Sequence, residues 1–353
     1  MAAPVTSRGK RTDTLWAAYK LRWNRRALLA RSWRKGRSLT RLADRTKQIR
    51  PDDILCFACM RNEAVRLPFW LDHYRKLGVA HFLIVVNDST DQTAAYLVSQ
   101  PDVSVWQTPE SYRKTRFGMD WVGALQRKYA DRHWCVTVDA DELLIYPQHD
   151  TRDLHALTAW LDQKGRASFG ATMLDLYPRG ALGEDRYRAG DDPTEVLGWY
   201  DAYPYWVQLQ PKYWNLWLQG GPRARMFFHE TPTLAPTLNK IPLVRWSKRY
   251  TYVSSTHTML PRHLNRTYDW AGTAKATGIL LHTKFLDEII AKSAEERLRQ
   301  EHFGDPKKFA AYYDALVAQP VLWTPESRAY MGWQDLVDVG LMQGADWTEY
   351  DQN

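Results

Sequence analysis

Three carboxylates follow one apolar stretch of this chain. In "WCVTVDADELLIYP", residues 134–147, Asp139, Asp141 and Glu142 come directly after five strand-like, mostly apolar residues. Asp139 and Asp141 are two residues apart, so on extended backbone their side chains point the same way. Like charges at close range raise a carboxyl pKa or require a cation. This pattern favours a Mg²⁺ or Mn²⁺ site shared with substrate phosphates over its plain alternative, a solvated acidic loop.

The residues around this motif alternate between strand-like and helix-like patterns with short connections. We expect strands at residues 53–60, 81–87, 103–106 and 134–139, and helices at residues 66–78, 92–97 and 118–130. Such alternation predicts an α/β fold with a mainly parallel sheet covered by helices. Ligands of such sheets bind beyond the carboxyl ends of the strands. The polar residues that follow the predicted strand ends are Arg61, Asn62, Glu63, Asn87, Asp88, Asp139 and Asp141.

Several stretches together resemble one enzyme family. "FACMRNEAVRLPFWLDHYRKLGVAHFLIVVNDSTDQT" and "VTVDADELLIYP" look like the bacterial family 2 glycosyltransferases of GT-A fold, in the branch with an R-N-E loop. The later stretches "MLDLYPRG", "KIPLVRW", "SSTHTMLP" and "GILLHTKFL" are similar to the same branch. The resemblance spans about residues 53–300. It is specific in combination, whereas D-x-D alone is common.

The resemblance implies a UDP- or GDP-sugar donor whose diphosphate is bridged to the protein by Mn²⁺ or Mg²⁺. Asp141 matches the principal metal ligand, and Asp139 matches the residue nearer the ribose or a metal-bound water. Glu142 is expected to orient the loop. Many such enzymes add a late histidine as a metal ligand, and His282 is our choice, with His257 as runner-up. The alternative for either histidine is a structural hydrogen-bonded group.

The same resemblance places the nucleotide at the loop of Arg61, Asn62 and Glu63, and at Asn87 after the next strand. An arginine there can contact base or phosphate, and the carboxylate can accept from base or ribose donors. One departure from the family is Val86, which stands where an acidic residue is frequent, so base recognition by an aspartate at that position is in doubt. Asp91 is expected to cap the following helix.

Three further arginines are candidates to neutralise the diphosphate, although exposed arginines are usually solubility or salt-bridge groups: Arg116, Arg223 and Arg225.

An inverting transferase needs a general base that takes the proton of the acceptor hydroxyl. The E-D motif that is familiar in this family is not visible. Glu230 in "FFHET" lies at a suitable distance beyond the D-x-D motif, with Asp201 and Asp175 as further candidates. The acceptor implied by the resemblance is a glycan or a lipid-linked glycan in surface polysaccharide assembly.

Two other functions compete with the glycosyltransferase. A sugar nucleotidyltransferase shares the sheet and the acidic metal site, but it usually has a Gly-rich basic loop after the first strand, and "CMRNEAVRLP" contains no glycine. A non-catalytic scaffold or polysaccharide-binding protein predicts no nucleotide-sugar binding. Dehydrogenases and P-loop enzymes are disfavoured because no G-x-G-x-x-G or Walker A loop follows a predicted strand.

Positive charge is concentrated at the start of the chain. Residues 1–50 hold 15 Lys and Arg against two acidic residues, whereas the remainder has 33 Lys and Arg against 38 Asp and Glu. A nucleic-acid binder that grips phosphates with its body would not concentrate its charge this way, so we expect no nucleic-acid partner. Residues 14–35 have helical spacing of Trp16, Tyr19 and Trp23 among basic residues. This helix is predicted to lie on an anionic membrane, to self-associate or bind a partner, or to remain a solvated or self-packed arm.

The composition also indicates a compartment and a domain plan. No apolar stretch approaches the length of a spanning helix and no signal-peptide pattern is present, so we expect a cytoplasmic protein, or one peripheral at the inner face of the membrane. Cys56 and Cys59 should lie on opposite faces of a strand and therefore be buried thiols.

The chain is predicted to divide into a basic arm (1–50), a GT-A domain (51–290, with halves 51–150 and 151–290) and a helical extension (291–353). We expect the aromatic stretch 199–217 to lie mostly in the core.

Overall fold

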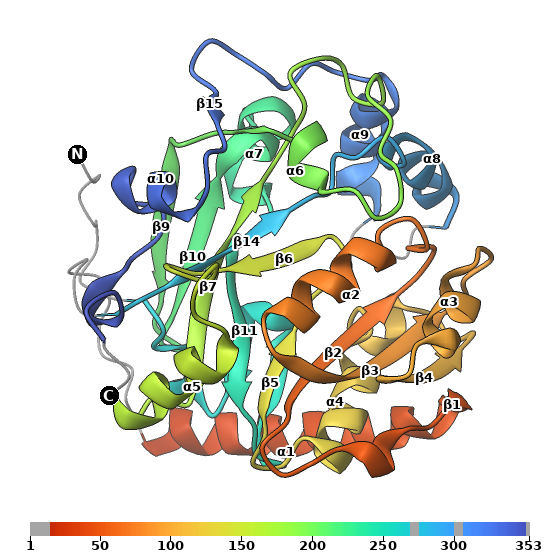
Figure 1. Ribbon diagram of the computed structural model, residues 1–353, viewed down its shortest axis with the longest axis vertical. Coiled ribbons are helices and arrows are strands. Elements are labelled where there is room, and N and C mark those ends of the chain that lie inside the picture. The colour runs from red at the N-terminus through yellow and green to blue at the C-terminus, as the bar shows by residue number, and fades with distance from the viewer. Residues whose placement is uncertain (1–14, 269–274, 300–305, 351–353) are drawn as a thin grey trace.

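A mixed β-sheet forms the centre of the molecule in the computed structural model, which describes residues 15–268, 275–299 and 306–350 (Figure 1). Over these residues its nine strands have the order β1-β4-β3-β2-β5-β11-β7-β14-β6. The α/β fold predicted from the sequence, a large sheet covered by helices, is confirmed. The strands are β1 (Thr40–Ala43), β2 (Ile54–Met60), β3 (Val79–Asn87), β4 (Val103–Thr108), β5 (Trp134–Thr137), β6 (Glu142–Ile145), β7 (Ser168–Asp175), β11 (Asn239–Arg245) and β14 (Gly278–His282).

The strands β4, β3, β2 and β5 run parallel, as do β7 and β14, whereas β1, β11 and β6 are antiparallel to their neighbours. β6 was not expected. It begins directly after the D-x-D turn and pairs with β14, so that Glu142 lies opposite His282. The carboxyl end of β14 is thereby brought to the acidic motif, although 140 residues separate them in the chain.

The helices cover both faces of this sheet (Figure 1). Each predicted helix of the first half is present within a few residues of its predicted limits. The region predicted as a helical extension, residues 291–353, contains most of α8 and all of α9 and α10, and residues 300–305 lie outside the described residues. The helices are α1 (Leu15–Lys35), α2 (Leu67–Lys76), α3 (Thr93–Ser99), α4 (Met119–Tyr129), α5 (Leu154–Gln163), α6 (Pro193–Val196), α7 (Gly221–Phe227), α8 (Ile289–Arg299), α9 (Pro306–Val317) and α10 (Trp333–Asp338).

Strand β2 shows why the sheet has two hydrophobic cores. Successive side chains of a strand point to opposite faces, and Cys56 and Ala58 pack in one core while Leu55 and Phe57 pack in the other. The Cys59 side chain packs beside the second core, so the two cysteines of the CxxC sequence lie on opposite faces, as predicted, and are free thiols. Cys56 is buried as expected, whereas Cys59 is only partly buried. The β2 strand is therefore buried on both sides and holds the loop that follows it rigidly.

The aromatic stretch 199–217 differs from its prediction. It forms β8 (Trp199–Tyr200) and a two-stranded ribbon of β9 (Tyr205–Gln210) and β10 (Asn215–Gly220). Of its aromatic side chains only that of Tyr200 is fully buried, and Tyr203 and Trp206 are exposed. The expectation that most of them lie in the core is wrong, because a ribbon of two strands has no second layer to cover it.

The remaining short strands are β12 (Thr251–Ser254), β13 (Thr258–Leu260) and β15 (Arg328–Ala329). The C-terminal segment packs back on the main body, since Trp347 is fully buried and its ring lies edge-on to that of Trp160 in α5. Within the described residues no helix combines the length and apolar character needed to cross a membrane. Residues 1–14 of the predicted arm and 351–353 of the predicted extension lie outside the described residues, and the predicted domain limits stay predictions.

Candidate active site

The D-x-D turn connects β5 to β6 at the carboxyl edge of the sheet. Helix α2 fixes it from one side, because Trp70 Nε1 donates to the carbonyl of Asp139 over 3.2 Å and Tyr74 Oη donates to that of Glu142 over 2.9 Å. Both rings are fully buried. The turn is therefore held by the core, while the carboxylates of Asp139 and Asp141 remain 47% and 24% exposed.

Asp141 belongs to a chain of four charged side chains. Its Oδ2 lies 3.1 Å from His282 Nε2, His282 Nδ1 lies 2.5 Å from Asp175 Oδ1, and Arg223 Nε donates to Asp175 Oδ2 over 2.7 Å. Asp175 and His282 face each other because β7 and β14 pair in parallel with these two residues in register. A histidine that donates through Nδ1 to a carboxylate presents Nε2 to a ligand, as in many metal sites. Asp175 is thus a partner of His282, which the sequence did not indicate.

The contacts among these four side chains shift the pKa values of Asp141, Asp175 and His282. Burial raises the pKa of Asp141, but the charge and hydrogen bond of His282 outweigh burial and hold it well below its usual range. Burial also opposes ionisation of Asp175, and Arg223 and His282 together lower its pKa. The pKa of His282 is raised, because the two carboxylates outweigh the effect of its burial. A cation that binds at Nε2 therefore has to displace a proton.

Lys240 is a second feature that the sequence did not indicate. Its ammonium lies 2.7 Å from Glu142 Oε1 and 3.2 Å from Asp139 Oδ2, and both Lys240 and Glu142 are nearly completely buried. Burial lowers the pKa of Lys240, but the two carboxylates outweigh it and raise that pKa. The other Glu142 oxygen accepts from the backbone N–H of Asp139 over 3.1 Å. Glu142 therefore supports the loop, as expected, with Lys240 as its counter-ion.

A cavity of about 410 Å³ opens beside these carboxylates. Nine of the predicted site residues contribute to its wall. The loops after β2 and β3, the turn between β5 and β6, and the end of β14 supply most of them, Arg223 lies in α7, and His257 precedes β13. The cavity is lined by the predicted residues Arg61, Asn62, Glu63, Asn87, Asp139, Asp141, Arg223, His282 and the runner-up His257, and also by Lys240, Lys284, Tyr112, Phe117 and Tyr313.

The loop of Arg61, Asn62 and Glu63 forms one wall, and α8 lies against it. Arg61 Nη1 lies 2.6 Å from Glu295 Oε1, and Glu63 Oε2 lies 2.7 Å from Lys292 Nζ. The loop is also tied to the segment after β3, since Asn62 Oδ1 accepts from the backbone N–H of Thr90 over 2.8 Å. Three further hydrogen bonds in this region fix Asn87 and Asp91. Asn87 Nδ2 donates to the carbonyls of Thr108 and Glu110, and Asp91 Oδ1 accepts from the backbone N–H of Thr93, the first residue of α3.

Besides Asp175, four predicted site residues do not line the cavity. Asp201 and Arg225 form an ion pair of 3.0 Å with each other, and Tyr177 donates to Asp201. Arg116 pairs with the buried Asp120 over 2.6 Å. The Glu230 side chain is 87% exposed. The structure thus gives Asp201, Arg225 and Arg116 partners in the body of the protein and leaves Glu230 at the surface, so their placement does not support the predicted roles.

His257 and Lys284 are two cavity residues with functional atoms that have no partner among the described residues. His257 Nδ1 donates to the carbonyl of Asn239 over 2.7 Å, which leaves Nε2 as an acceptor without a hydrogen-bond partner among the described residues. Burial, followed by the charge of Lys240, lowers the pKa of His257 to about 3, so the ring is neutral. Lys284 has no ion pair with a described residue, and burial lowers its pKa although Asp141 opposes this.

The metal-ligating side chains of the site fit a cation whose remaining ligands come from the substrate. Among the residues that the structure describes, no group of three or more His, Cys, Asp and Glu side chains is arranged to hold a metal ion. Mg²⁺ and related ions are nevertheless commonly held by one or two protein ligands together with substrate phosphates and waters. Asp141 and His282, aligned by Asp175, supply two such ligands, while the carboxylate of Asp139 is turned to Lys240.

Comparison with known proteins leaves the family open. The chain matches no protein-family model and no curated protein. Solved structures that match it include a 4-diphosphocytidyl-2C-methyl-D-erythritol synthase (16% identity, 39% of this chain, 68% of that chain, TM-score 0.24). Another is HddC from Yersinia pseudotuberculosis (8% identity, 69% of this chain, 99% of that chain, TM-score 0.28). A third is a UTP-bound UGPase from Acinetobacter baumannii (10% identity, 74% of this chain, 83% of that chain, TM-score 0.28). Similarity this low carries no argument about activity, so the function is argued from the site.

Proposed function

We propose that the protein is a metal-dependent glycosyltransferase that moves a sugar from a nucleoside diphosphate sugar to an acceptor hydroxyl. The observation that carries the proposal is the alignment of Asp141, His282 and Asp175 at the carboxyl edge of the sheet. Asp141 and His282 would hold Mn²⁺ or Mg²⁺, which supplies charge neutralisation at the departing diphosphate when bound. Lys284, which lines the cavity and has no ion pair with a described residue, would bind a phosphate oxygen.

The loop after β2 favours this activity over the nucleotidyltransferase. A loop that wraps around a triphosphate needs free backbone N–H groups and glycines, as in nests. Here the N–H groups of Asn62, Glu63 and Ala64 already donate to side chains of Ser89, Thr93 and Asp91. The loop therefore presents side chains to the cavity, as in recognition of a base or ribose.

We assign the general base to His257 in place of Glu230 and Asp201. Its Nε2 is unprotonated, and the Asn239 carbonyl holds the tautomer. Burial is the larger cause of the depressed pKa of His257, and a diphosphate bound near Lys240 and Lys284 would offset the smaller part that comes from positive charge. Glu230 would have to move into the cavity to reach an acceptor, and Asp201 would have to leave Tyr177 and Arg225.

Thermal unfolding with UDP- and GDP-sugars tests the binding step. We expect one donor to raise the melting temperature in Mn²⁺ and not in EDTA, and Asp141→Asn to remove this shift. Asp52→Asn, an exposed carboxylate without a partner described, is the matched control. If no donor acts in metal, or if Asp141→Asn responds like the parent protein, the proposal fails.

The products separate the two enzyme classes. A glycosyltransferase releases a nucleoside diphosphate, whereas a nucleotidyltransferase exchanges pyrophosphate with a nucleoside triphosphate. With an acceptor in hand, His257→Gln should lower kcat by roughly 10²–10⁴, the usual contribution of a general base. Glu230→Gln should leave kcat unchanged, and the reverse ranking would return the role to Glu230.

A further inference from the structure

The outer face of α1 is an aromatic and basic stripe. At 100° per residue, Trp16, Tyr19, Trp23 and Trp33 lie within one side of the helix, and their side chains are 62%, 49%, 52% and 57% exposed. Monomeric proteins seldom expose contiguous large apolar side chains without a partner. The opposite side carries Leu21 and Ser32, which are buried against the body. The stripe is therefore the side of α1 that does not pack on the described body of the protein.

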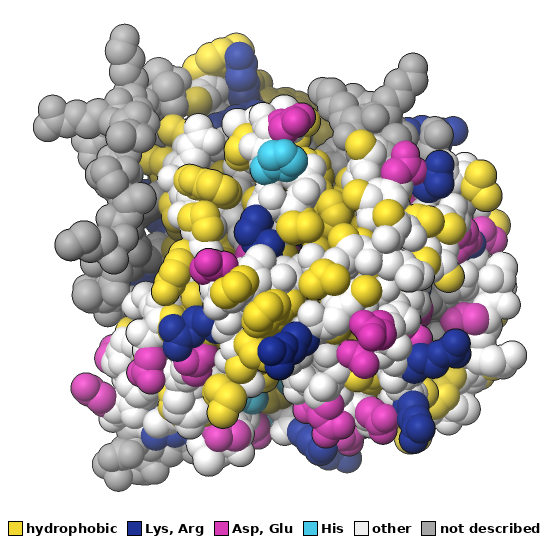
Figure 2. Space-filling view, turned by 90° about the horizontal axis from the view of Figure 1, so that it is seen from above, with side chains coloured by type: hydrophobic (Ala, Val, Ile, Leu, Met, Phe, Trp, Pro, Cys, Tyr) yellow, Lys and Arg dark blue, Asp and Glu magenta, His cyan; other side chains and the backbone are white. Residues whose placement is uncertain are grey.

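Charge on this helix has one sign. The sequence of α1 contains seven Lys and Arg and no acidic residue. Lys20 and Arg26 lie over the rings of Trp16 and Trp23, with 5.1 and 5.3 Å to the ring centres. Neither they nor Arg22 and Arg34 have an ion pair with a described residue. The face opposite α1 differs, since it mixes acidic, basic and hydrophobic side chains (Figure 2).

A groove of about 530 Å³ continues the stripe at the C-terminal end of α1. Trp33 belongs to both, and the guanidinium of Arg37, just beyond the end of α1, lies 4.0 Å from the ring centre of Trp33. No acidic residue is among the described residues that line the groove. Its basic and aromatic lining consists of Trp33, Arg37, Arg41, Trp106, Arg127, Lys128 and Tyr129.

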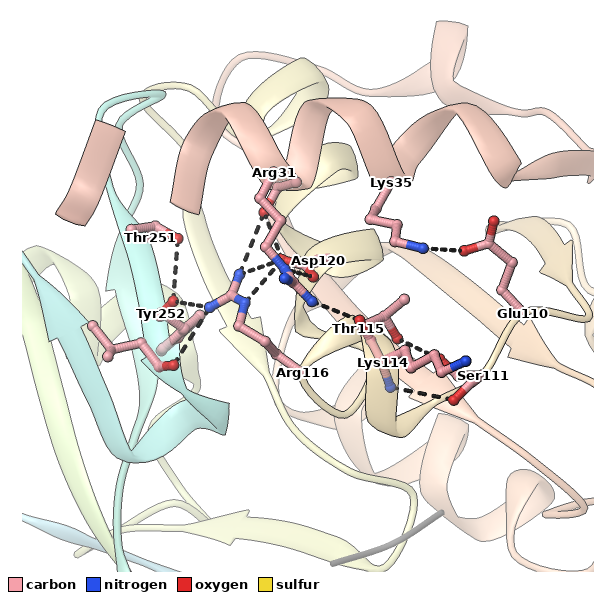
Figure 3. A network of polar contacts seen from close by, with 12 residues as sticks. Arg31, Lys35, Glu110, Ser111, Lys114, Thr115, Arg116, Asp120, Thr251 and Tyr252 are labelled. Carbon is pink, nitrogen blue, oxygen red and sulfur yellow. Dashed lines mark hydrogen bonds and ion pairs between the residues drawn. The ribbon is translucent and has the colours of Figure 1, made fainter. Parts of the chain in front are cut away.

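The helix is anchored so that it presents this face rigidly (Figure 3). Arg31 Nε lies 2.6 Å from Asp120 Oδ2, and Arg31 Nη2 donates to the carbonyl of Lys114 over 2.5 Å. Lys35 Nζ lies 2.8 Å from Glu110 Oε2. Close packing adds to these bonds, because a Cβ on Gly36 would come within 2.5 Å of that of Ala124 in α4. The loop at 110–118 that receives the arginine also contributes Tyr112 and Phe117 to the cavity wall.

We infer that α1 and its groove form a binding surface for an anionic phospholipid membrane. Tryptophan and tyrosine favour the interface between headgroups and acyl chains, and Lys and Arg around them attract acidic headgroups. The groove has the size and charge to receive a phosphate of a headgroup. A second copy of the chain fits poorly, because a symmetric contact through α1 would place cations of one helix against those of the other. The inference does not depend on the proposed transferase activity.

Flotation of the full chain with vesicles tests the inference. We expect binding to vesicles of phosphatidylcholine with phosphatidylserine and none to phosphatidylcholine alone. Trp16→Ala/Tyr19→Ala/Trp23→Ala should weaken binding roughly tenfold or more, and Arg22→Glu/Arg26→Glu by at least roughly 25-fold, since each basic side chain near the surface contributes about fivefold. All altered side chains are exposed, and circular dichroism checks that the variants fold.

Matched controls sit away from the stripe. Trp206→Ala in β9 removes another exposed tryptophan, and Arg186→Glu/Arg188→Glu reverses two exposed arginines far from α1, so both should bind vesicles like the parent. Equal loss in the controls, or vesicle binding that survives in both α1 variants, would overturn the inference. So would a dimer in light scattering that the α1 variants dissociate, or binding to an RNA oligonucleotide without binding to vesicles.

Discussion

The cavity and the outer face of α1 use the same basic side chains in opposite ways. In the cavity wall Lys240, Arg223 and Arg61 each lie beside a carboxylate, at distances of 2.6–2.7 Å. Along α1 the exposed Lys20 and Arg26 lie over aromatic rings and have no acidic partner among the described residues. Only the cations that anchor the helix, Arg31 and Lys35, pair with carboxylates of the described body. Buried charges must be compensated within the protein, whereas exposed ones are solvated. Unpaired cations thus mark where an anion from outside can bind.

The largest expected effect comes from breaking a buried pair. Lys240→Met leaves Glu142 without its counter-ion in the core, and loss of one partner of a buried pair costs about 3–5 kcal/mol. Chemical denaturation should show this loss in the free energy of unfolding. Adding Glu142→Gln to Lys240→Met should recover a large part of it, because the uncompensated charge is removed. If Lys240→Met left the free energy of unfolding unchanged, the ion pair of Lys240 and Glu142 would not be required for stability, and the prediction would be wrong.

A smaller effect is expected from the partner of His282. Asp175→Asn weakens the hold on the Nδ1 proton and leaves Arg223 without a full counter-charge. We expect the affinity for Mn²⁺ to fall roughly 10–100-fold, the usual cost of losing such a partner. Isothermal titration with Mn²⁺ and the nucleotide measures this. Asp201→Asn, which alters a buried carboxylate outside the cavity wall, should leave the affinity for Mn²⁺ unchanged.

The contribution of the two regions to stability should differ in its pH dependence. The interior holds histidines that must stay neutral, whereas the basic residues of α1 are all Lys and Arg. Burial lowers the pKa of His73 to about 4, and this ring is hydrogen-bonded to the Leu144 carbonyl over 2.9 Å. Its folded pKa lies below the unfolded value of about 6.5, so the stabilisation is complete above pH 6.5 and is lost as the pH falls toward 4. Between pH 6.5 and 5 this loss is about 2 kcal/mol. Denaturation of His73→Gln across this range should show a shallower decline than the parent, and parallel curves would contradict the assignment.

The smallest effect is expected on α1. Arg26→Met removes an exposed cation with no acidic partner described, so the free energy of unfolding should change by no more than about 0.5 kcal/mol. The same variant should reduce vesicle binding. If Arg26→Met lost nearly as much stability as Lys240→Met, the exposed cations of α1 would be as important to the fold as the paired cations of the cavity wall, and the comparison would fail.

Local patterns predicted the early elements well. The run of apolar residues before Asp139, the proline and glycine limits of α2, and the alternation in β2 each depend on neighbours in sequence. The same patterns placed the loop of Arg61, Asn62 and Glu63, as well as Asp139 and Asp141, at one edge of the sheet. They failed for the ribbon at 205–220, because an aromatic residue has the same local pattern in a core and on an uncovered strand.

The sequence by itself determined which strands end in polar groups and that the first helix carries cations without carboxylates. Only the tertiary structure decided which of those groups pair. Asp175 and His282 are 107 residues apart, and Lys240 and Asp139 are 101 apart. Their contacts depend on the positions of β11 and β14 between and beside strands that come much earlier in the chain. Periodicity encodes the face of an element, but the order of strands in a sheet is set by long-range packing, and that order brought His282, Asp175 and Lys240 to the acidic turn.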